Sequence, residues 1–109
     1  MHTPEELNQY IRLTLKQHKI KCDVVWDEGL TDTLGLADGL NNRIQLSPRI
    51  CCSFTLFNEV FLHELAHISD FLDRGNYKRN GRNDFHGENW KKHCAALGVR
   101  ARRLIPCSI

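Results

Sequence analysis

The fold of this chain is decided by residues 54–72, FTLFNEVFLHELAHISDFL. Apolar side chains lie on nearly every side of the helix that this segment would form, which is typical of a helix buried at the centre of a domain. They are Leu56, Phe57, Val60, Phe61, Leu62, Leu65, Ala66, Ile68 and Phe71. Three polar residues, His63, Glu64 and His67, interrupt this apolar surface. Because buried polar groups are unfavourable unless they are paired or bind a metal ion, these three indicate a functional site.

The spacing of the two histidines predicts a metal site. Residues four apart on a helix lie on one face, a single turn apart, so both imidazoles of His63-Glu64-Leu65-Ala66-His67 can reach one metal ion. Zinc lowers the pKa of a bound water molecule toward neutrality and polarises a substrate carbonyl group. Glu64 stands beside the pair and can accept the proton of that water. The pattern therefore predicts zinc-dependent attack of water on a substrate carbonyl group, with Glu64 as the general base.

A third metal ligand is expected outside this helix, because a catalytic zinc site usually has three protein ligands and one open position for water. His86 is the candidate, since Gly87 follows it and would let the backbone approach the metal closely. Glu88 is the alternative, because zinc also accepts a carboxylate. Asp70 and Asp73 lie further along the central helix and are predicted to be supporting or surface groups.

Two periodicities divide the residues before the central helix. Residues 4–18 carry apolar side chains at steps of three and four, and Thr3 can cap the helix that they predict. Over residues 22–27 the period changes to two, as in a half-buried strand. Two further strands are predicted at residues 34–38 and 43–46, on either side of a turn whose Gly and Asn residues tolerate positive φ. The sequence predicts a small three-stranded antiparallel sheet after an N-terminal helix.

A surface loop and a last helix are predicted after the central helix. Residues 75–84 are rich in Gly and Asn and have no apolar periodicity, which favours a loop. Residues 87–97 have one apolar face, and Gly98 is placed to end a helix there. Together these elements predict an α+β fold in which the last helix brings His86 to the histidine pair.

Length and composition exclude several classes of protein. The chain has 109 residues, of which 41% are apolar and 26% charged, so we expect one folded domain over residues 1–109 and not a disordered chain. No window approaches the roughly 18 apolar residues of a membrane span, and the first twenty residues lack the apolar stretch of a signal peptide. The five cysteines show no Cys-x-x-Cys spacing, so we expect reduced thiols. These observations predict a cytoplasmic protein with no membrane partner.

Charge is distributed unevenly along the chain. Residues 1–73 contain six basic and eleven acidic side chains, whereas residues 74–103 contain nine basic and two acidic ones. Basic side chains gathered on one face suit a polyanion such as DNA, and a solvated basic surface without a partner is the alternative. The residues predicted to contact DNA phosphates are Lys91, Lys92, Arg100, Arg102 and Arg103.

Three motifs, taken together, resemble those of the SprT-like metalloprotease domain, a family that includes the DNA-protein crosslink protease Spartan. They are residues 39–48 ending in Ile44-Gln45-Leu46-Ser47-Pro48, the motif His63-Glu64-Leu65-Ala66-His67, and His86-Gly87-x-x-Trp90. The histidine motif alone occurs in many zincins, but its combination with the other two is much more specific. The resemblance covers residues 7–97. It implies zinc ligation by His63, His67 and His86 and general base catalysis by Glu64.

The resemblance also implies a zincin-like fold, hydrolysis of peptide bonds and a protein or peptide substrate, with DNA-associated proteins as a substrate class. Many family members carry a C-terminal zinc ribbon or separate DNA-binding segments, and from the length of this chain we expect a minimal protease core without them. We expect an edge strand at residues 43–46 to hold the substrate in extended form.

Two other functions remain as alternatives. One is a binding module in which the metal only stabilises the fold and the basic third of the chain binds nucleic acid; such a module has no use for Glu64. The other is an ImmA-like regulatory metallopeptidase that cleaves a repressor. That class more often uses an acidic third ligand, whereas His86 favours the SprT-like resemblance.

Overall fold

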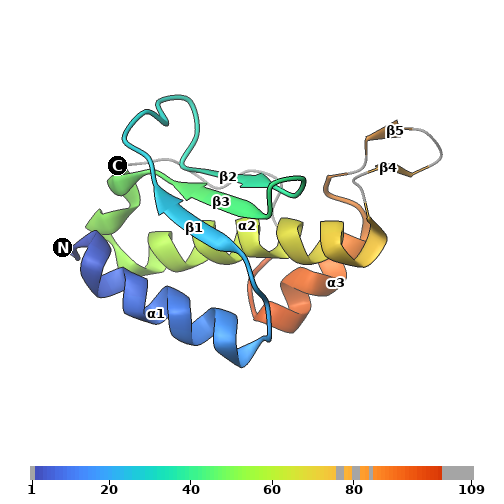
Figure 1. Cartoon of the computed structure of the whole chain (residues 1–109), viewed down its shortest axis with the longest axis horizontal. Helices are drawn as coiled ribbons and strands as arrows, with labels where there is room; N and C mark the ends of the chain where they lie inside the picture. Colours follow the sequence, from blue (N-terminus) through green and yellow to red (C-terminus); the bar gives the residue numbers. More distant parts are fainter. Residues whose placement is uncertain (1, 76–77, 80–81, 84, 102–109) are drawn as a thin grey trace.

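The computed structural model describes residues 2–75, 78–79, 82–83 and 85–101. In chain order its elements are α1 (Pro4–Gln17), β1 (Asp23–Trp26), β2 (Gly35–Asp38), β3 (Arg43–Leu46), the short 3-10 helix η1 (Pro48–Cys52), α2 (Phe54–Arg74), β4 (Lys78–Arg79), β5 (Arg82–Asn83) and α3 (Glu88–Leu97). In Figure 1, α2 runs between the sheet of β1, β2 and β3, drawn above it, and the helices α1 and α3, drawn below it. The predicted α+β class is confirmed.

Local signals in the sequence define both ends of α2. Ser53 accepts a hydrogen bond from the amide of Leu56 at 3.3 Å, and Gly75 follows the last turn in the left-handed region with φ of 77°. Similar signals begin α1 at Thr3 and end α3 at Gly98, as the sequence predicts. The resulting α2 has 21 residues and is therefore roughly 31 Å long, enough to run along most of the molecule.

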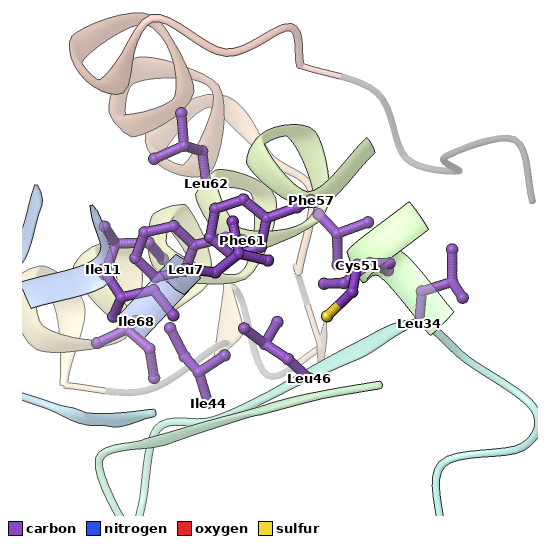
Figure 2. Close-up of a cluster of buried hydrophobic side chains, with 13 residues drawn as sticks. Leu7, Ile11, Leu34, Ile44, Leu46, Cys51, Phe57, Phe61, Leu62 and Ile68 are labelled. Atoms are coloured by element: carbon purple, nitrogen blue, oxygen red, sulfur yellow. The ribbon is translucent and has the colours of Figure 1, made fainter. Parts of the chain in front are cut away.

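One apolar core joins α1, the sheet, η1 and α2. Its buried members are Leu7, Ile11, Leu34, Ile44, Leu46, Ile50, Cys51, Phe57, Val60, Phe61, Leu62, Leu65 and Ile68. Figure 2 shows Phe57 and Phe61 of α2 at the centre of this cluster, where their rings stack with centroids 5.7 Å apart. Because close packing on this side leaves α2 little freedom to rotate, the side chains on its other side are held in fixed directions.

The three-stranded sheet is mixed, and the prediction that it is antiparallel is wrong. The strand order is β1-β3-β2: β3 pairs antiparallel with β2 across the predicted hairpin and parallel with β1. After β1 the chain crosses over, forms β2 at the far edge and returns to place β3 between them. An alternation of apolar and polar residues indicates which side chains share a face of the sheet, but it does not indicate which strands are neighbours. The sequence pattern therefore predicted the strands without their order.

The central position of β3 also corrects the expectation about the substrate-binding strand. Residues 43–46 were expected to form an edge, but each of them is paired on both sides, with β1 and with β2. The edges of the sheet are β1 and β2. Gly35 of β2 lies directly against Val60 and Glu64 of α2. The edge strand next to the polar residues of α2 is therefore β2.

The hairpin between β2 and β3 uses its glycine to save space. Asn42 adopts positive φ, 52°, as the turn prediction allows, whereas the φ of Gly39 is not in the left-handed region. A Cβ atom at Gly39 would overlap the ring of Phe71 on α2. The missing side chain lets the hairpin pack directly on α2.

The region that the sequence predicts as a plain loop contains two short strands. β4 and β5 pair antiparallel, with Lys78 opposite Asn83 and Arg79 opposite Arg82. Residues 76–77, 80–81 and 84 of the predicted loop lie outside the described residues. Strands of two residues are too short to leave a periodic pattern, so the sequence could not reveal them.

The structure also bears on the expectations about cysteines and membranes. Four cysteines fall within the described residues, and all four are free thiols, as expected; Cys107 lies outside that part. Burial raises the pKa of Cys94 to about 11 and, with the nearby charge of Asp23, that of Cys22 to about 11.

No helix within the described ranges has the length and apolar character needed to cross a membrane. The cytoplasmic location stays a prediction.

Candidate metal centre

His63, His67 and His86 converge on one point. The atoms of these side chains that could bind a metal all lie within 4.8 Å of one another. On α2 the ring centroids of His63 and His67 are 4.9 Å apart, and the ring of His86 lies 4.8 Å from His67 and 5.6 Å from His63. Within the described residues no other group of three His, Cys, Asp or Glu side chains is placed in this way. The structure therefore brings together the three histidines that the sequence predicts as ligands.

The chemistry of this donor set fits a metal ion that takes nitrogen ligands. His63 and His67 are each only 7% exposed. Burial, followed by the nearby His63 and His86, lowers the pKa of His67 to about 3, so this imidazole is neutral at physiological pH. Neutral imidazole is the form that binds metals. Three imidazoles suit zinc and similar transition metals, whereas magnesium and calcium prefer oxygen ligands.

Trp90 of α3 packs against all three imidazoles. Its side chain is fully buried, and its ring centroid lies 4.7 Å from His86, 5.1 Å from His63 and 5.4 Å from His67. The indole plane is nearly parallel to His67 and nearly perpendicular to His86, with interplanar angles of 20° and 86°. Trp90 therefore restricts how each imidazole can turn. The sequence showed only its position in the downstream motif, because contact with two histidines of α2 and with His86, which precedes α3, is a tertiary property.

Glu64 follows His63 on α2 and lies against the edge strand β2. Its side chain is 8% exposed, and its Oε2 atom would be 3.2 Å from a Cβ atom placed on Gly35 of β2. Burial raises the pKa of Glu64 to about 8. A cation held by the neighbouring imidazoles would favour the ionised carboxylate. The ionised carboxylate is the form that a general base needs.

This arrangement agrees with the comparison with known families. A model of the SprT-like family matches residues 4–107. The chain belongs to the SprT-like family. This family is associated with metalloproteases. Neither a curated protein nor a solved structure matches the chain.

In this SprT-like chain a buried carboxylate, that of Asp70, links α2 to the start of α3. Asp70, one turn beyond His67, is fully buried and accepts hydrogen bonds from Arg74 Nε at 2.6 Å and Nη2 at 2.8 Å. Asn89 Nδ2 donates a third bond to Asp70 at 2.7 Å. Because Asn89 is three residues after His86, this bond restrains the segment that carries the third histidine. The sequence predicted a supporting or surface role for Asp70, but nothing in it pointed to Asn89.

Two other predicted candidates of the SprT-like chain lie at the surface. The side chain of Glu88 is 80% exposed and lies 3.6 Å from Lys91 Nζ, so the structure brings His86, and not Glu88, to the histidine pair. Asp73 is 53% exposed and pairs with His93, at 3.2 Å between Oδ2 and Nε2. Hydrogen bonds from His93 and Asn89 lower the pKa of Asp73.

The described basic residues that were predicted to contact DNA lie on α3 and just beyond its end. Lys91 and Lys92 are exposed in its first turns, whereas Arg100 is exposed beyond its last residue, beside a hollow at the start of α2. A helix of ten residues is about 15 Å long, so these side chains start from opposite ends of that length. Arg102 and Arg103 lie outside the described residues.

Proposed function

We propose that this SprT-like protein is a zinc-dependent peptidase. The observation that supports it is the convergence of His63, His67 and His86 beside the buried carboxylate of Glu64. The three imidazoles are the proposed zinc ligands. A bound zinc ion would supply a water molecule of lowered pKa and would polarise the carbonyl group of the scissile bond.

Glu64 is the proposed proton carrier of the reaction. Its carboxylate accepts a proton from the attacking water as the new carbon–oxygen bond forms, and it then passes this proton to the amine that leaves when the carbon–nitrogen bond breaks. Burial raises the pKa of this carboxyl group in the metal-free chain, and a zinc ion held by the imidazoles would lower it again and favour the carboxylate, the form that accepts a proton. Trp90 and the bond from Asn89 to Asp70 hold the imidazoles in place around it.

The strand that we assign to substrate binding is β2. An extended peptide can add to the edge of a sheet through main-chain hydrogen bonds. β2 is an edge, and its first residue, Gly35, contacts the side chain of Glu64. A peptide aligned along β2 would therefore pass close to the proposed base. This geometry favours protein or peptide substrates held in extended form.

The two alternative functions have less support. A module stabilised by a structural metal has no use for a carboxylate buried beside the ligands, yet Glu64 is 8% exposed there. An ImmA-like repressor peptidase would more often place an acidic residue as third ligand, and the cluster has His86. The family match is to SprT-like proteins.

Metal removal tests the proposed activity. The purified chain should contain one zinc ion and should hydrolyse fluorescently labelled casein, an unstructured protein. Dialysis against a chelator should abolish hydrolysis, because the three imidazoles alone do not activate water, and one equivalent of zinc should restore it. Zinc content is measured by mass spectrometry in parallel. Hydrolysis that persists in the metal-free protein would contradict the proposal.

We further propose that DNA-associated proteins are among the substrates and that DNA is held by exposed lysines near the site. Lys91 and Lys92 lie five and six residues after His86 and are both exposed, although Glu88 offsets part of the charge of Lys91. Each phosphate contact that is lost should reduce the salt dependence of binding by about one unit.

The double variant Lys91→Ala/Lys92→Ala should therefore lower the slope of log affinity against log salt by about two units, equally for unrelated duplexes. Fluorescence anisotropy at low salt measures this. Arg12→Ala/Lys16→Ala, which removes two exposed charges from α1, is the matched control and should leave the slope unchanged. If the wild-type protein binds no duplex at low salt, DNA is not a partner.

A further inference from the structure

Gly35 of β2 has no room for a side chain beside the proposed catalytic residue. A Cβ atom at this position would lie 2.8 Å from Val60 Cγ1, 3.0 Å from Glu64 Cγ and 3.2 Å from Glu64 Oε2. All three distances are shorter than ordinary van der Waals contact between such atoms. The backbone conformation does not require glycine, because φ of Gly35 is not in the left-handed region. The absence of a side chain is therefore a matter of space beside Glu64.

The backbone around Gly35 cannot easily move away from α2. Its carbonyl oxygen accepts a hydrogen bond from Thr33 Oγ1 at 2.9 Å. The carbonyl of Leu34 accepts one from the amide of Ser47 at 2.9 Å, and the carbonyl of Thr33 one from Arg49 Nη2 at 3.2 Å. Pairing with β3 holds the strand from its other side. An added methyl group must be accommodated mainly by the side chains that it meets.

The two side chains that face Gly35 differ in their freedom to move. Val60 is 1% exposed within the apolar core, and β-branched residues in a helix are almost confined to one rotamer. Glu64 is unbranched and can change its torsions more easily. A side chain at position 35 would therefore displace Glu64 and its carboxylate in preference to Val60.

We propose that Gly35 is a positioning residue for Glu64. The backbone of β2, which has no side chain at this position, packs against Glu64 and keeps its carboxylate in one conformation. The proposal rests on the proposed function of Glu64 as general base. Proton transfer needs the carboxylate within hydrogen-bonding distance of the attacking water. A displacement of about 1 Å can reduce a catalysed rate by about 100-fold. Gly35 thus acts on the reaction without touching the substrate's reacting atoms.

Gly35→Ala should lower kcat by about 10- to 100-fold, because the proton transfer is impaired. KM should stay within about twofold, because the new methyl group meets α2, whereas a peptide added to β2 would bind its main-chain groups. Zinc stoichiometry should stay at one, since the atoms nearest the new methyl belong to Val60 and Glu64. Gly39→Ala is the matched control. It also introduces a methyl into this hairpin, but against the ring of Phe71, so it should lower the thermal midpoint without lowering the kcat of the folded protein.

A second variant separates positioning from packing. Gly35→Ala/Val60→Ala removes the closest obstacle, Val60, and keeps the contact with Glu64, with Val60→Ala alone as reference. The double variant should have the same thermal midpoint as Val60→Ala, but its kcat should be at least about 10-fold lower than that of Val60→Ala. Recovery of kcat to the reference value would show that Gly35 serves packing only.

The wild-type protein and a Glu64→Gln variant distinguish the two hypotheses. If the wild type hydrolyses casein and the glutamine variant does not, the proposed function stands, and a Gly35→Ala variant with wild-type kcat overturns only the positioning role. If the wild type is inactive with zinc bound, or the glutamine variant is as active as the wild type, the proposed function fails, and the positioning role fails with it.

Discussion

The Glu64→Gln variant is expected to lose about 10²- to 10⁴-fold in kcat for peptide hydrolysis while it keeps one zinc ion per chain. Glutamine has nearly the same shape as glutamate, but its amide cannot take the proton of the attacking water. The cluster of His63, His67 and His86 does not include Glu64, so zinc content should not change. Steady-state hydrolysis of a fluorogenic peptide and metal analysis of the same sample measure both quantities. Loss of zinc, or unimpaired turnover, would show that Glu64 has another role.

Unfolding of the metal-free protein shows whether the Glu64→Gln variant still folds. Burial raises the pKa of Glu64 from 4.5 to about 8, so between these pH values the folded chain binds more protons than the unfolded chain. The free energy of unfolding of the wild type should therefore fall as pH rises through this window, by up to about 1.4 kcal/mol per pH unit. Glutamine does not titrate. In urea unfolding, the variant should accordingly gain stability relative to the wild type as pH rises toward 8.

Replacing His86 by alanine should weaken zinc binding by more than about 100-fold, because even residues that only support a metal ligand change affinity by 10- to 100-fold. The loss should also appear in stability. With zinc in excess, each tenfold loss of affinity lowers the free energy of unfolding by about 1.4 kcal/mol, since zinc binds only the folded chain. Competition with a chromophoric chelator gives the affinity, and thermal unfolding with and without zinc gives the stability.

Glu88→Ala is the matched control for the third ligand. Glu88 is two residues from His86, but its side chain is 80% exposed and pairs with Lys91. Its loss should change zinc affinity by no more than about twofold, because surface ion pairs contribute little. If instead Glu88→Ala released zinc and His86→Ala did not, the site would have two histidines and a glutamate, and the third ligand proposed here would be wrong.

Helices and strands whose ends and faces depend on residues close in the sequence were predictable from the sequence. Ser53 and Gly75 bound α2, and its spacing of four residues places His63 and His67 on one face, because a helix repeats every 3.6 residues. A period of two located β1, and the turn rich in Gly and Asn located β2 and β3 on either side of it. His86 was predictable as a third ligand from the residues that follow it, but only the fold shows how close it lies to His63 and His67.

Tertiary structure alone decided how these elements meet. The order β1-β3-β2, which makes β2 and not β3 the edge beside Glu64, joins strands whose own patterns carry no information about their neighbours. The contact of Trp90 with three imidazoles and the bond from Asn89 to Asp70 depend on how α3 packs on α2. A glycine inside a strand pattern often marks a close backbone approach, so Gly35 carried a signal. The sequence alone determined which side chains could do the chemistry, because helix and strand periods are local; the fold decided which residues surround them, because those contacts join residues far apart in the chain.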